Sequence, residues 1–281
     1  LPDQDSVLRT VNASLVLRNQ DLLLSMATPS ALPPTKIDLQ KVSKSFGGKI
    51  VLDELDLAIY EGESVVILGG SGSGKSVLLK HMIGLLAPDS GTVVVDGVDI
   101  AALDGRAITG FRRRFGMAFQ EGALFDSMTV AENVGFALRR AGRPPAEIAA
   151  RVAECLEMVH LEGAEQKMPA ELSGGMRRRV GFARAIALEP KILLFDEPTT
   201  GLDPVMKAVI DQLILELQAK LGSTAVSITH DMDSAFRIAE RIAMLHQGKI
   251  IAYAPPAEFR ASPDPRVQQF IQGLATGPLT E

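Results

Sequence analysis

The stretch GGSGSGKS, at residues 69–76, carries the residue types that bind phosphate, in the spacing G-x-x-x-x-G-K-[ST]. Its glycines let backbone N–H groups turn towards a polyanion, and the N-terminus of a following helix would add a positive dipole end. Lys75 supplies a charge to terminal phosphates, and the Ser76 hydroxyl can bind Mg²⁺. The next residue, Val77, is not proposed as a site residue. The predicted phosphate-binding residues are Gly69, Gly70, Ser71, Gly72, Ser73, Gly74, Lys75 and Ser76.

Two carboxylates follow an apolar run further along the chain, in KILLFDEP. Asp196 would stand at the carboxyl end of a buried strand, where ligands bind in open α/β sheets. It suits Mg²⁺, directly or through water, and Glu197 can polarise a water in line with a γ-phosphate. Both could merely cap the next segment, but the phosphate loop in the same chain favours a nucleotide site. We therefore predict ATP and Mg²⁺ as ligands.

A second glycine-rich turn, LSGGMRRR at residues 172–179, offers no base, no nucleophile and no metal ligand. Its arginines are interpreted as a solvated helix face with some attraction for phosphate. The net charge of −5 argues against a general nucleic-acid binder, so no nucleic-acid partner is expected.

The chain has a single cysteine, Cys155, which lies in the apolar stretch VAECLEMV and is interpreted as core packing. A single cysteine cannot form an internal disulfide, which favours a reducing, cytoplasmic setting.

The elements around these stretches alternate strand and helix, which predicts an α/β core. Residues 36–46 and 50–60 alternate as half-buried antiparallel strands, whereas 63–70 is a continuous apolar run typical of a fully buried strand. From 121 to about 189 helical patterns dominate, and Thr129 with Glu132 forms a capping-box pattern. Strands and helices then resume and close with a hairpin at 241–253.

The two ends of the chain lie outside this pattern. Residues 1–35 are interpreted as an extension and Pro/Ser-rich linker, with the natural start expected at Met26 and residues 1–25 dispensable. Residues 263–281 form a tail with a predicted short helix, in which Val267, Phe270 and Ile271 share one face. That face would be covered by its own domain or by a partner, and a partner is slightly preferred. No apolar run approaches the roughly 20 residues that span a bilayer.

Six motifs in a fixed order resemble the ATP-binding-cassette (ABC) ATPases: the phosphate loop, Gln120 after FGMAF, LSGGM, ILLFDEP, GLDP and ITHD. The resemblance covers residues 36 to about 254. It implies an ABC nucleotide-binding domain over 36–262, built on a P-loop NTPase fold: a RecA-like core, an antiparallel β subdomain and a helical subdomain at about 121–189.

The resemblance also implies roles for particular residues. Two chains would pack head to tail as a homodimer, so that Ser173, Gly174 and Gly175 face the γ-phosphate held by the partner's phosphate loop. Gln120 would sense Mg²⁺ and the attacking water, His230 would contact the γ-phosphate, and Asp203 would help to join the two sites. Phe46 stands where the family stacks an aromatic residue, most often tyrosine, on adenine; it could instead be a core residue at a strand end.

Within the family, the segments FQEGALFDSMTVAENVGFALR, ELSGGMRRRVGFARAIALEP and SPDPRVQQFIQGLATGP resemble the ATPase subunit of Mla-type (MCE-associated) transporters. That resemblance implies phospholipid transport between the inner and outer membranes, which maintains outer-membrane lipid asymmetry. The implied partners are a membrane permease dimer, an MCE lipid-binding protein and a small STAS-domain protein, with the chain at the cytoplasmic face of the inner membrane. The alternatives are another importer ATPase, for example for polar amino acids, and a non-transport cassette, which is less favoured.

Overall fold

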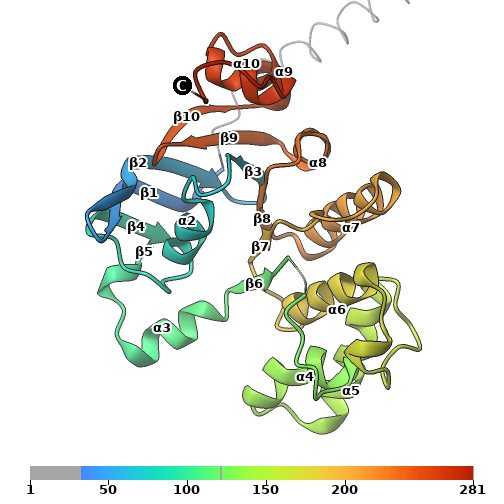
Figure 1. The fold of residues 1–281 in the computed structure, drawn as a ribbon. Coiled ribbons are helices and arrows are strands. Elements are labelled where there is room, and N and C mark those ends of the chain that lie inside the picture. Colours follow the sequence, from blue (N-terminus) through green and yellow to red (C-terminus); the bar gives the residue numbers. More distant parts are fainter. Residues whose placement is uncertain (1–32, 121, 281) are drawn as a thin grey trace, which may run out of the picture. The chain divides into compact units, whose positions relative to one another are not determined.

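The computed structural model describes residues 33–120 and 122–280. The expected start at Met26 and the extension before it lie outside the described residues. Backbone contacts divide the chain after Pro34, and Thr35–Glu281 forms the unit to which all that follows belongs. Two sheets organise this unit, together with helices that separate into distinct groups (Figure 1).

The first sheet is antiparallel and has the order β2-β1-β4-β5. Its long strands keep their apolar side chains on one buried face even though the alternation slips once in each strand. The slips fall at Lys41 and Glu54, whose positive φ angles of 48° and 44° accompany shifts of register. The bounds are β1 Thr35–Phe46, β2 Lys49–Tyr60, β4 Ser90–Val95 and β5 Val98–Asp99.

The second sheet has the order β10-β9-β3-β8-β7-β6 and is parallel except for the final β9–β10 hairpin. Every residue of β3 and of β8 is buried, as expected for central strands covered on both faces. The bounds are β3 Ser64–Leu68, β6 Phe115–Ala118, β7 Ile192–Asp196, β8 Thr224–Thr229, β9 Arg241–His246 and β10 Lys249–Ala254.

The helices connect these strands. The helix after the phosphate loop ends earlier than its apolar pattern suggests, because Gly84 takes a φ of 64° soon after Met82. The bounds are α2 Lys75–Met82, α3 Gly105–Arg112, α4 Val130–Arg140, α5 Pro145–Met158, α6 Gly174–Ile186, α7 Pro204–Leu221, α8 Met232–Ile238, α9 Pro256–Arg260 and α10 Pro265–Gln272, with 3-10 turns at Ile100–Ala102 and Pro169–Glu171.

Helices α4, α5 and α6 form the helical part predicted between the strands (Figure 1). The capping box is present: Thr129 Oγ1 accepts from the Glu132 backbone N–H at 3.2 Å, and the Glu132 carboxylate accepts from the Thr129 N–H at 2.8 Å. Cys155 is wholly buried there, and burial raises its pKa to about 11, so it packs as a neutral thiol. The expected α/β cassette architecture is confirmed.

The C-terminal segment packs against its own domain. Val267 on α10 is wholly buried within the larger apolar core, and Phe270, Ile271 and Leu279 pack partly against that core. Burying a valine side chain contributes about 1.5–3 kcal/mol, which is enough to hold a short helix in place. The preference for a partner as the cover of this face is therefore corrected: the domain itself covers Val267.

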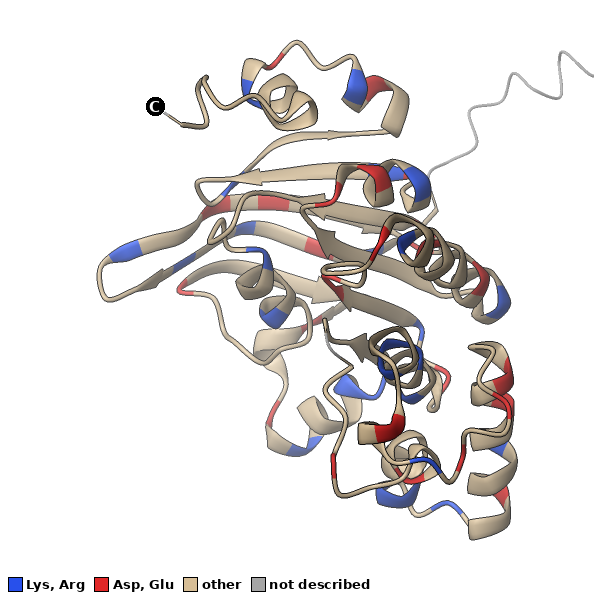
Figure 2. Cartoon of the chain, turned by 45° about the vertical axis from the view of Figure 1, so that its right-hand side comes forward, with Lys and Arg blue, Asp and Glu red and all other residues tan. Residues whose placement is uncertain are grey.

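Charged residues are spread over the unit. In the view of Figure 2, basic and acidic segments alternate along the helices rather than gathering into one basic stripe. Within the described ranges, no helix is both long and apolar enough to cross a membrane.

Candidate nucleotide-binding site

The register of the six-stranded sheet brings the predicted site residues to one edge. Leu68 at the end of β3 pairs with Thr229 at the end of β8, and Asp196 at the end of β7 pairs with Ile228. Ala118 at the end of β6 pairs with Phe195. The phosphate loop follows β3, Glu197 follows β7, His230 follows β8, and Phe119 and Gln120 follow β6. Carboxyl ends of parallel strands are where α/β proteins bind ligands.

The phosphate loop requires glycine at particular positions. A Cβ atom on Gly69 would lie 2.6 Å from the Leu245 carbonyl oxygen, which is too close for any side chain. Gly74 has a φ of 105°, a conformation open to glycine, and it stands immediately before α2. The loop therefore turns tightly around the start of the helix, whose free N–H groups favour an anion.

Lys75 curls back over this loop. Its Nζ donates to the carbonyl oxygens of Gly69 at 2.7 Å and Gly70 at 3.0 Å, so two of the three ammonium protons are engaged and one remains for an anion. Burial lowers the pKa of Lys75, while the carboxylates of Glu197 and Asp196 act in the opposite direction. A phosphate would supply the negative charge that this desolvated ammonium favours.

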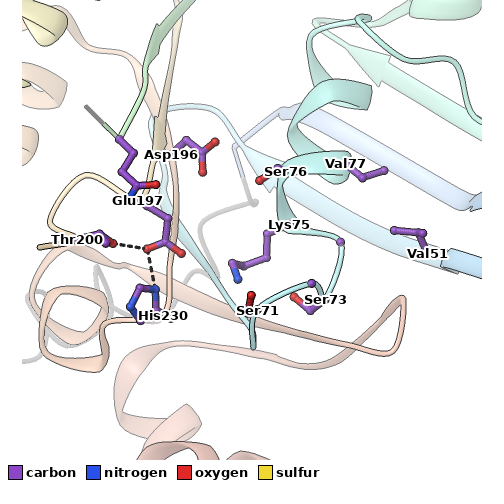
Figure 3. Close-up of a pocket in the computed structure, with 13 residues that line it drawn as sticks. Val51, Ser71, Ser73, Lys75, Ser76, Val77, Asp196, Glu197, Thr200 and His230 are labelled. Carbon is purple, nitrogen blue, oxygen red and sulfur yellow. Dashed lines mark hydrogen bonds and ion pairs between the residues drawn. The ribbon is translucent and has the colours of Figure 1, made fainter. Parts of the chain in front are cut away.

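Glu197 follows β7 in a left-handed conformation, with a φ of 51°. Its Oε2 accepts from the Thr200 hydroxyl at 2.9 Å and from the Thr229 hydroxyl at 3.4 Å, and His230 Nδ1 lies 2.9 Å from the same oxygen. All three groups converge on one carboxylate oxygen, which fixes the direction of the other, Oε1. Figure 3 shows the side chains of Glu197, Thr200 and His230 across the cavity from Lys75.

Asp196 carries an unfavourable charge in the free protein. Burial, and then the neighbouring Glu197 carboxylate, raise the pKa of Asp196 against the opposing effects of Lys75 and Lys80. A bound cation would relieve this cost. No three His, Cys, Asp or Glu side chains of the described ranges cluster as a metal centre. A nucleotide-bound Mg²⁺ needs only one or two protein ligands besides phosphate and water, so the oxygens of Ser76, Asp196 and Gln120 fit it.

A cavity of about 560 Å³ joins these groups, a volume in the range of small-molecule sites. Gly70 lines a second cavity of about 530 Å³, which shares the loop residues Ser71–Ser73 with the first. Of the predicted residues, the first cavity is lined by Ser71, Gly72, Ser73, Gly74, Lys75, Ser76, Gln120, Asp196, Glu197 and His230 (Figure 3).

Val77, which the sequence interpretation leaves out of the site, also lines this cavity (Figure 3). Its side chain packs partly against the apolar core beneath the antiparallel sheet, and it carries no polar atom that could bind phosphate. Val77 therefore shapes the wall of the cavity at the first turn of α2, next to the residues that bind the ligand.

The remaining predicted residues do not line that cavity. Ser173 is the N-cap of α6, with Gly174 and Gly175 in its first turn, and Gly174 lines a separate cavity. Asp203 caps α7 by accepting from the N–H groups of Val205 and Met206, both at 3.0 Å. Phe46 ends β1 and is 47% exposed, so it is not a core residue; Lys44 Nζ lies 5.6 Å from its ring centroid.

Two polar residues near the site escaped the sequence interpretation. Thr200, which lines the cavity and donates to Glu197, stands only three residues beyond that carboxylate. Arg178 is 8% exposed, which corrects the interpretation of the three arginines as a solvated face; Arg177 is exposed, as that interpretation expected. A hydroxyl so close to Glu197 was a signal available in the sequence, whereas the burial of Arg178 was not.

Residues 52–200 match the ABC transporter family. This match covers more than half of the chain, and the chain therefore belongs to the ABC transporter family. Together with the phosphate-binding cavity and its carboxylates, membership makes it an ATP-binding cassette that hydrolyses ATP.

Several curated relatives are similar over most of the chain. The intermembrane phospholipid transport system ATP-binding protein MlaF of Escherichia coli K12 is 42% identical over 244 residues, which are 86% of this chain and 91% of MlaF. The probable ribonucleotide transport ATP-binding protein mkl of Mycobacterium leprae is 41% identical over 86% of this chain and 70% of its own length. The methionine import ATP-binding protein MetN of Caulobacter vibrioides is 46% identical over a shorter stretch, 76% of this chain and 65% of MetN.

A solved cassette has the same fold. The ATP-binding cassette MJ0796, in a dimeric structure of a post-hydrolysis state bound to ADP and Pi, aligns with a TM-score of 0.71 and 36% identity. The alignment covers 78% of this chain and 98% of that one.

Proposed function

We propose that this chain powers the movement of phospholipid between two membranes. The supporting observation is the extent of the similarity to MlaF, which spans 91% of the length of that protein. The other relatives are covered less completely, at 70% and 65% of their length. An ATPase subunit must bind its membrane partners as well as ATP, and surfaces outside the catalytic motifs make those contacts. Similarity that extends beyond the catalytic motifs therefore favours a shared transport system.

The geometry supports a role for each side chain in ATP hydrolysis. Lys75 and the loop N–H groups would bind the β- and γ-phosphates, and Ser76, Asp196 and Gln120 would hold Mg²⁺, which would neutralise charge on those phosphates. Glu197 accepts a proton from the attacking water through its less engaged oxygen, Oε1. His230 keeps that carboxylate in place through the 2.9 Å contact and lines the cavity, where it would contact the γ-phosphate.

The second glycine-rich turn completes the site of a partner chain in this proposal. Ser173, Gly174 and Gly175 lie outside the cavity of their own phosphate loop, which is what a contribution across a dimer requires. The fold is shared with a cassette solved as a dimer. Asp203, at the start of α7, would join the two sites, and Phe46, exposed at the end of β1, would stack on adenine.

The wider assembly follows from the same proposal. An ABC transporter ATPase works as a dimer with a membrane permease. The finer partners are proposals: a permease dimer, an MCE lipid-binding protein and a small STAS-domain protein. The chain would then lie peripherally at the cytoplasmic face of the inner membrane, held there by the permease.

Reconstitution with the native membrane partners tests the function. Donor vesicles holding the complex receive a fluorescent phospholipid, and its transfer to or from acceptor vesicles is followed with and without ATP. We expect ATP-dependent transfer that disappears in the Glu197→Gln complex. ATP-dependent uptake of methionine or a ribonucleotide, with no lipid transfer, would contradict the proposal and favour an importer of small molecules, the candidate to which the 46% identity with MetN points.

A further inference from the structure

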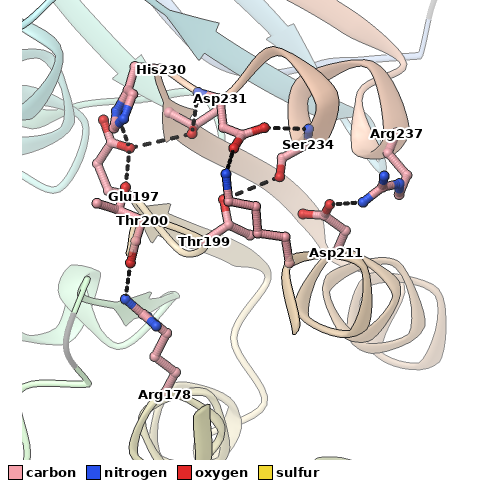
Figure 4. Close-up of polar contacts among 11 residues, drawn as sticks. Arg178, Glu197, Thr199, Thr200, Asp211, His230, Asp231, Ser234 and Arg237 are labelled. Atoms are coloured by element: carbon pink, nitrogen blue, oxygen red, sulfur yellow. Dashed lines mark hydrogen bonds and ion pairs between the residues drawn. The ribbon is translucent and has the colours of Figure 1, made fainter. Parts of the chain in front are cut away.

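Arg178 projects from α6 into the junction between that helix and the catalytic edge of the sheet (Figure 4). Its Nε donates to the carbonyl oxygen of Gln120 at 2.7 Å, and its Nη2 donates to the carbonyl oxygen of Thr200. The planar guanidinium holds these two donors at a fixed angle, so the two carbonyls are held relative to each other. Arg178 is 8% exposed, and such burial of a cation is costly without partners of this kind.

The Thr200 end of this bridge leads directly to the general base. The Thr200 hydroxyl donates to Glu197 Oε2 at 2.9 Å, and the Thr200 backbone N–H donates to the Glu197 carbonyl oxygen at 3.4 Å. The carboxylate is therefore tied to Thr200 through both main chain and side chain. A displacement of the Thr200 backbone would therefore remove one of the three groups that hold this carboxylate opposite Lys75.

The Gln120 end of the bridge lies where α6 also binds the chain that follows Gln120. Arg184, also on α6, donates to the carbonyl oxygens of Gly122 and Ala123, both at 2.8 Å. Gly181 packs so closely on this loop that an added Cβ would lie 2.8 Å from the Gly122 Cα atom. Helix α6 thus holds Gln120, Gly122 and Ala123 against itself, and Arg178 connects it to the segment after β7.

We propose that Arg178 is a positioning residue for ATP hydrolysis, which sets the orientation of Glu197 through Thr200 according to the position of α6. The inference rests on Glu197 acting as the general base. When α6 packs against the sheet as it does in this structure, Arg178 bridges the carbonyl oxygens of Gln120 and Thr200, and the Glu197 carboxylate is fixed in orientation. When they separate, the bridge loses one carbonyl, and the carboxylate loses the support of Thr200.

The test measures ATP turnover by the full chain, at protein concentrations where turnover per chain no longer rises. Arg178→Gln shortens the side chain and removes the fork, and we expect kcat to fall on the order of 10- to 100-fold with KM for ATP little changed. Arg151→Gln is the matched control. Arg151 also bridges two carbonyls, of Ala187 at 3.1 Å and Ile186 at 2.8 Å, with a side chain 12% exposed. It should lose stability without losing kcat.

A double-mutant cycle shows whether Arg178 acts through Thr200. Thr200→Val should lower kcat, Thr200→Ser should keep it, and Arg178→Gln should add little in the Thr200→Val background because the path is already broken. Independent, multiplying effects, or an equal loss of kcat in Arg151→Gln, would overturn the proposal. Should Arg178→Gln fail to fold, Arg178→Lys goes through the same cycle. If Glu197→Gln itself leaves turnover unchanged, the assignment of the base fails and the role of Arg178 fails with it. If Glu197→Gln abolishes turnover but Arg178→Gln leaves kcat unchanged, only the role of Arg178 is overturned.

Discussion

The two glycine-rich turns both lead into a helix, but the structure completes the two helix starts differently. No described side chain caps α2, which follows Gly74 in its left-handed conformation. At α6, the Ser173 hydroxyl accepts from the Met176 N–H at 3.2 Å. The first-turn N–H groups of a helix lack partners within the helix, so those of α2 are left for a ligand whereas α6 satisfies one internally.

The surroundings sharpen this difference. The cavity at the start of α2 is lined by the buried Lys75, by the carboxylates of Asp196 and Glu197, and by His230. The groups proposed to hydrolyse ATP therefore lie around this first turn. Around α6, the chain places arginines that bond to its own carbonyl oxygens. One turn is thus built as the catalytic half of a site, and the other as a stable helix start that can contribute an anion contact but no chemistry.

The largest effect should come from removing the base from the first turn's site. Glu197→Gln keeps the shape of the side chain but cannot accept a proton, so we expect turnover to fall on the order of 10²- to 10⁴-fold while ATP binding persists. Binding by calorimetry and phosphate release by the full chain measure the two. Glu216→Gln, an exposed carboxylate on α7 beside His160, is the control and should change neither. Turnover at the wild-type rate in Glu197→Gln would refute the assignment of Glu197 as the general base.

A mixing experiment addresses whether the second turn serves another chain. Ser173→Arg blocks the α6 turn, and Lys75→Ala weakens phosphate binding at α2. Random pairing makes half of the dimers mixed, each with one intact site, so activity should recover to about a quarter of wild type. Lys75→Ala mixed with itself is the control. If mixed dimers form and stay inactive although dimers of wild type with Lys75→Ala, which keep one intact site, are active, the contribution across the dimer is refuted.

The parts of this site that depend on short spacings could be predicted from the sequence. The loop at 69–76 and the pair Asp196 and Glu197 each follow a continuous apolar run, and a buried parallel strand delivers them to a known edge. The strand pattern and the capping box at Thr129 and Glu132 were predictable for the same reason: each depends on neighbours in the chain.

What depended on distant packing could not be predicted. Arg178 looks like its neighbours in RRR, and only the placement of α6 against the segment after β7 buries it. The stripe around Val267 shows that the tail must be covered, but an apolar face carries no information about which surface covers it. The hydroxyl of Thr200 gains its role from the left-handed turn at Glu197, a backbone conformation that residue types rarely reveal.

A smaller effect should separate two adjacent glycines of the phosphate loop. Gly69→Ala brings Cβ to 2.6 Å from the backbone oxygen of Leu245, which cannot move aside cheaply, whereas Gly70→Ala meets nothing within 4 Å. We expect Gly69→Ala to cost about 1–3 kcal/mol of folding free energy and Gly70→Ala to remain close to wild type in thermal unfolding. Equal losses of stability in the two variants would mean that the loop backbone can shift to accept a side chain at Gly69. The close approach of Gly69 to Leu245 would then not explain the conformation of the phosphate loop.

The smallest effect should be on the stability of the nucleotide-free chain, through the negative charge of Asp196. Burial and Glu197 raise the pKa of Asp196, so its ionised form destabilises the free protein at neutral pH. Asp196→Asn should therefore raise the melting temperature of the nucleotide-free chain while weakening Mg²⁺-dependent ATP binding. Because the folded-state pKa lies above the unfolded one, this gain is full above the folded pKa. It shrinks as pH falls through that value and vanishes below the unfolded pKa, where wild-type Asp196 is neutral in both states. Unfolding curves of both proteins across acidic and neutral pH measure it. A gain independent of pH would trace the effect to packing rather than charge, and a loss of stability would show that Asp196 holds the fold as well as the ligand.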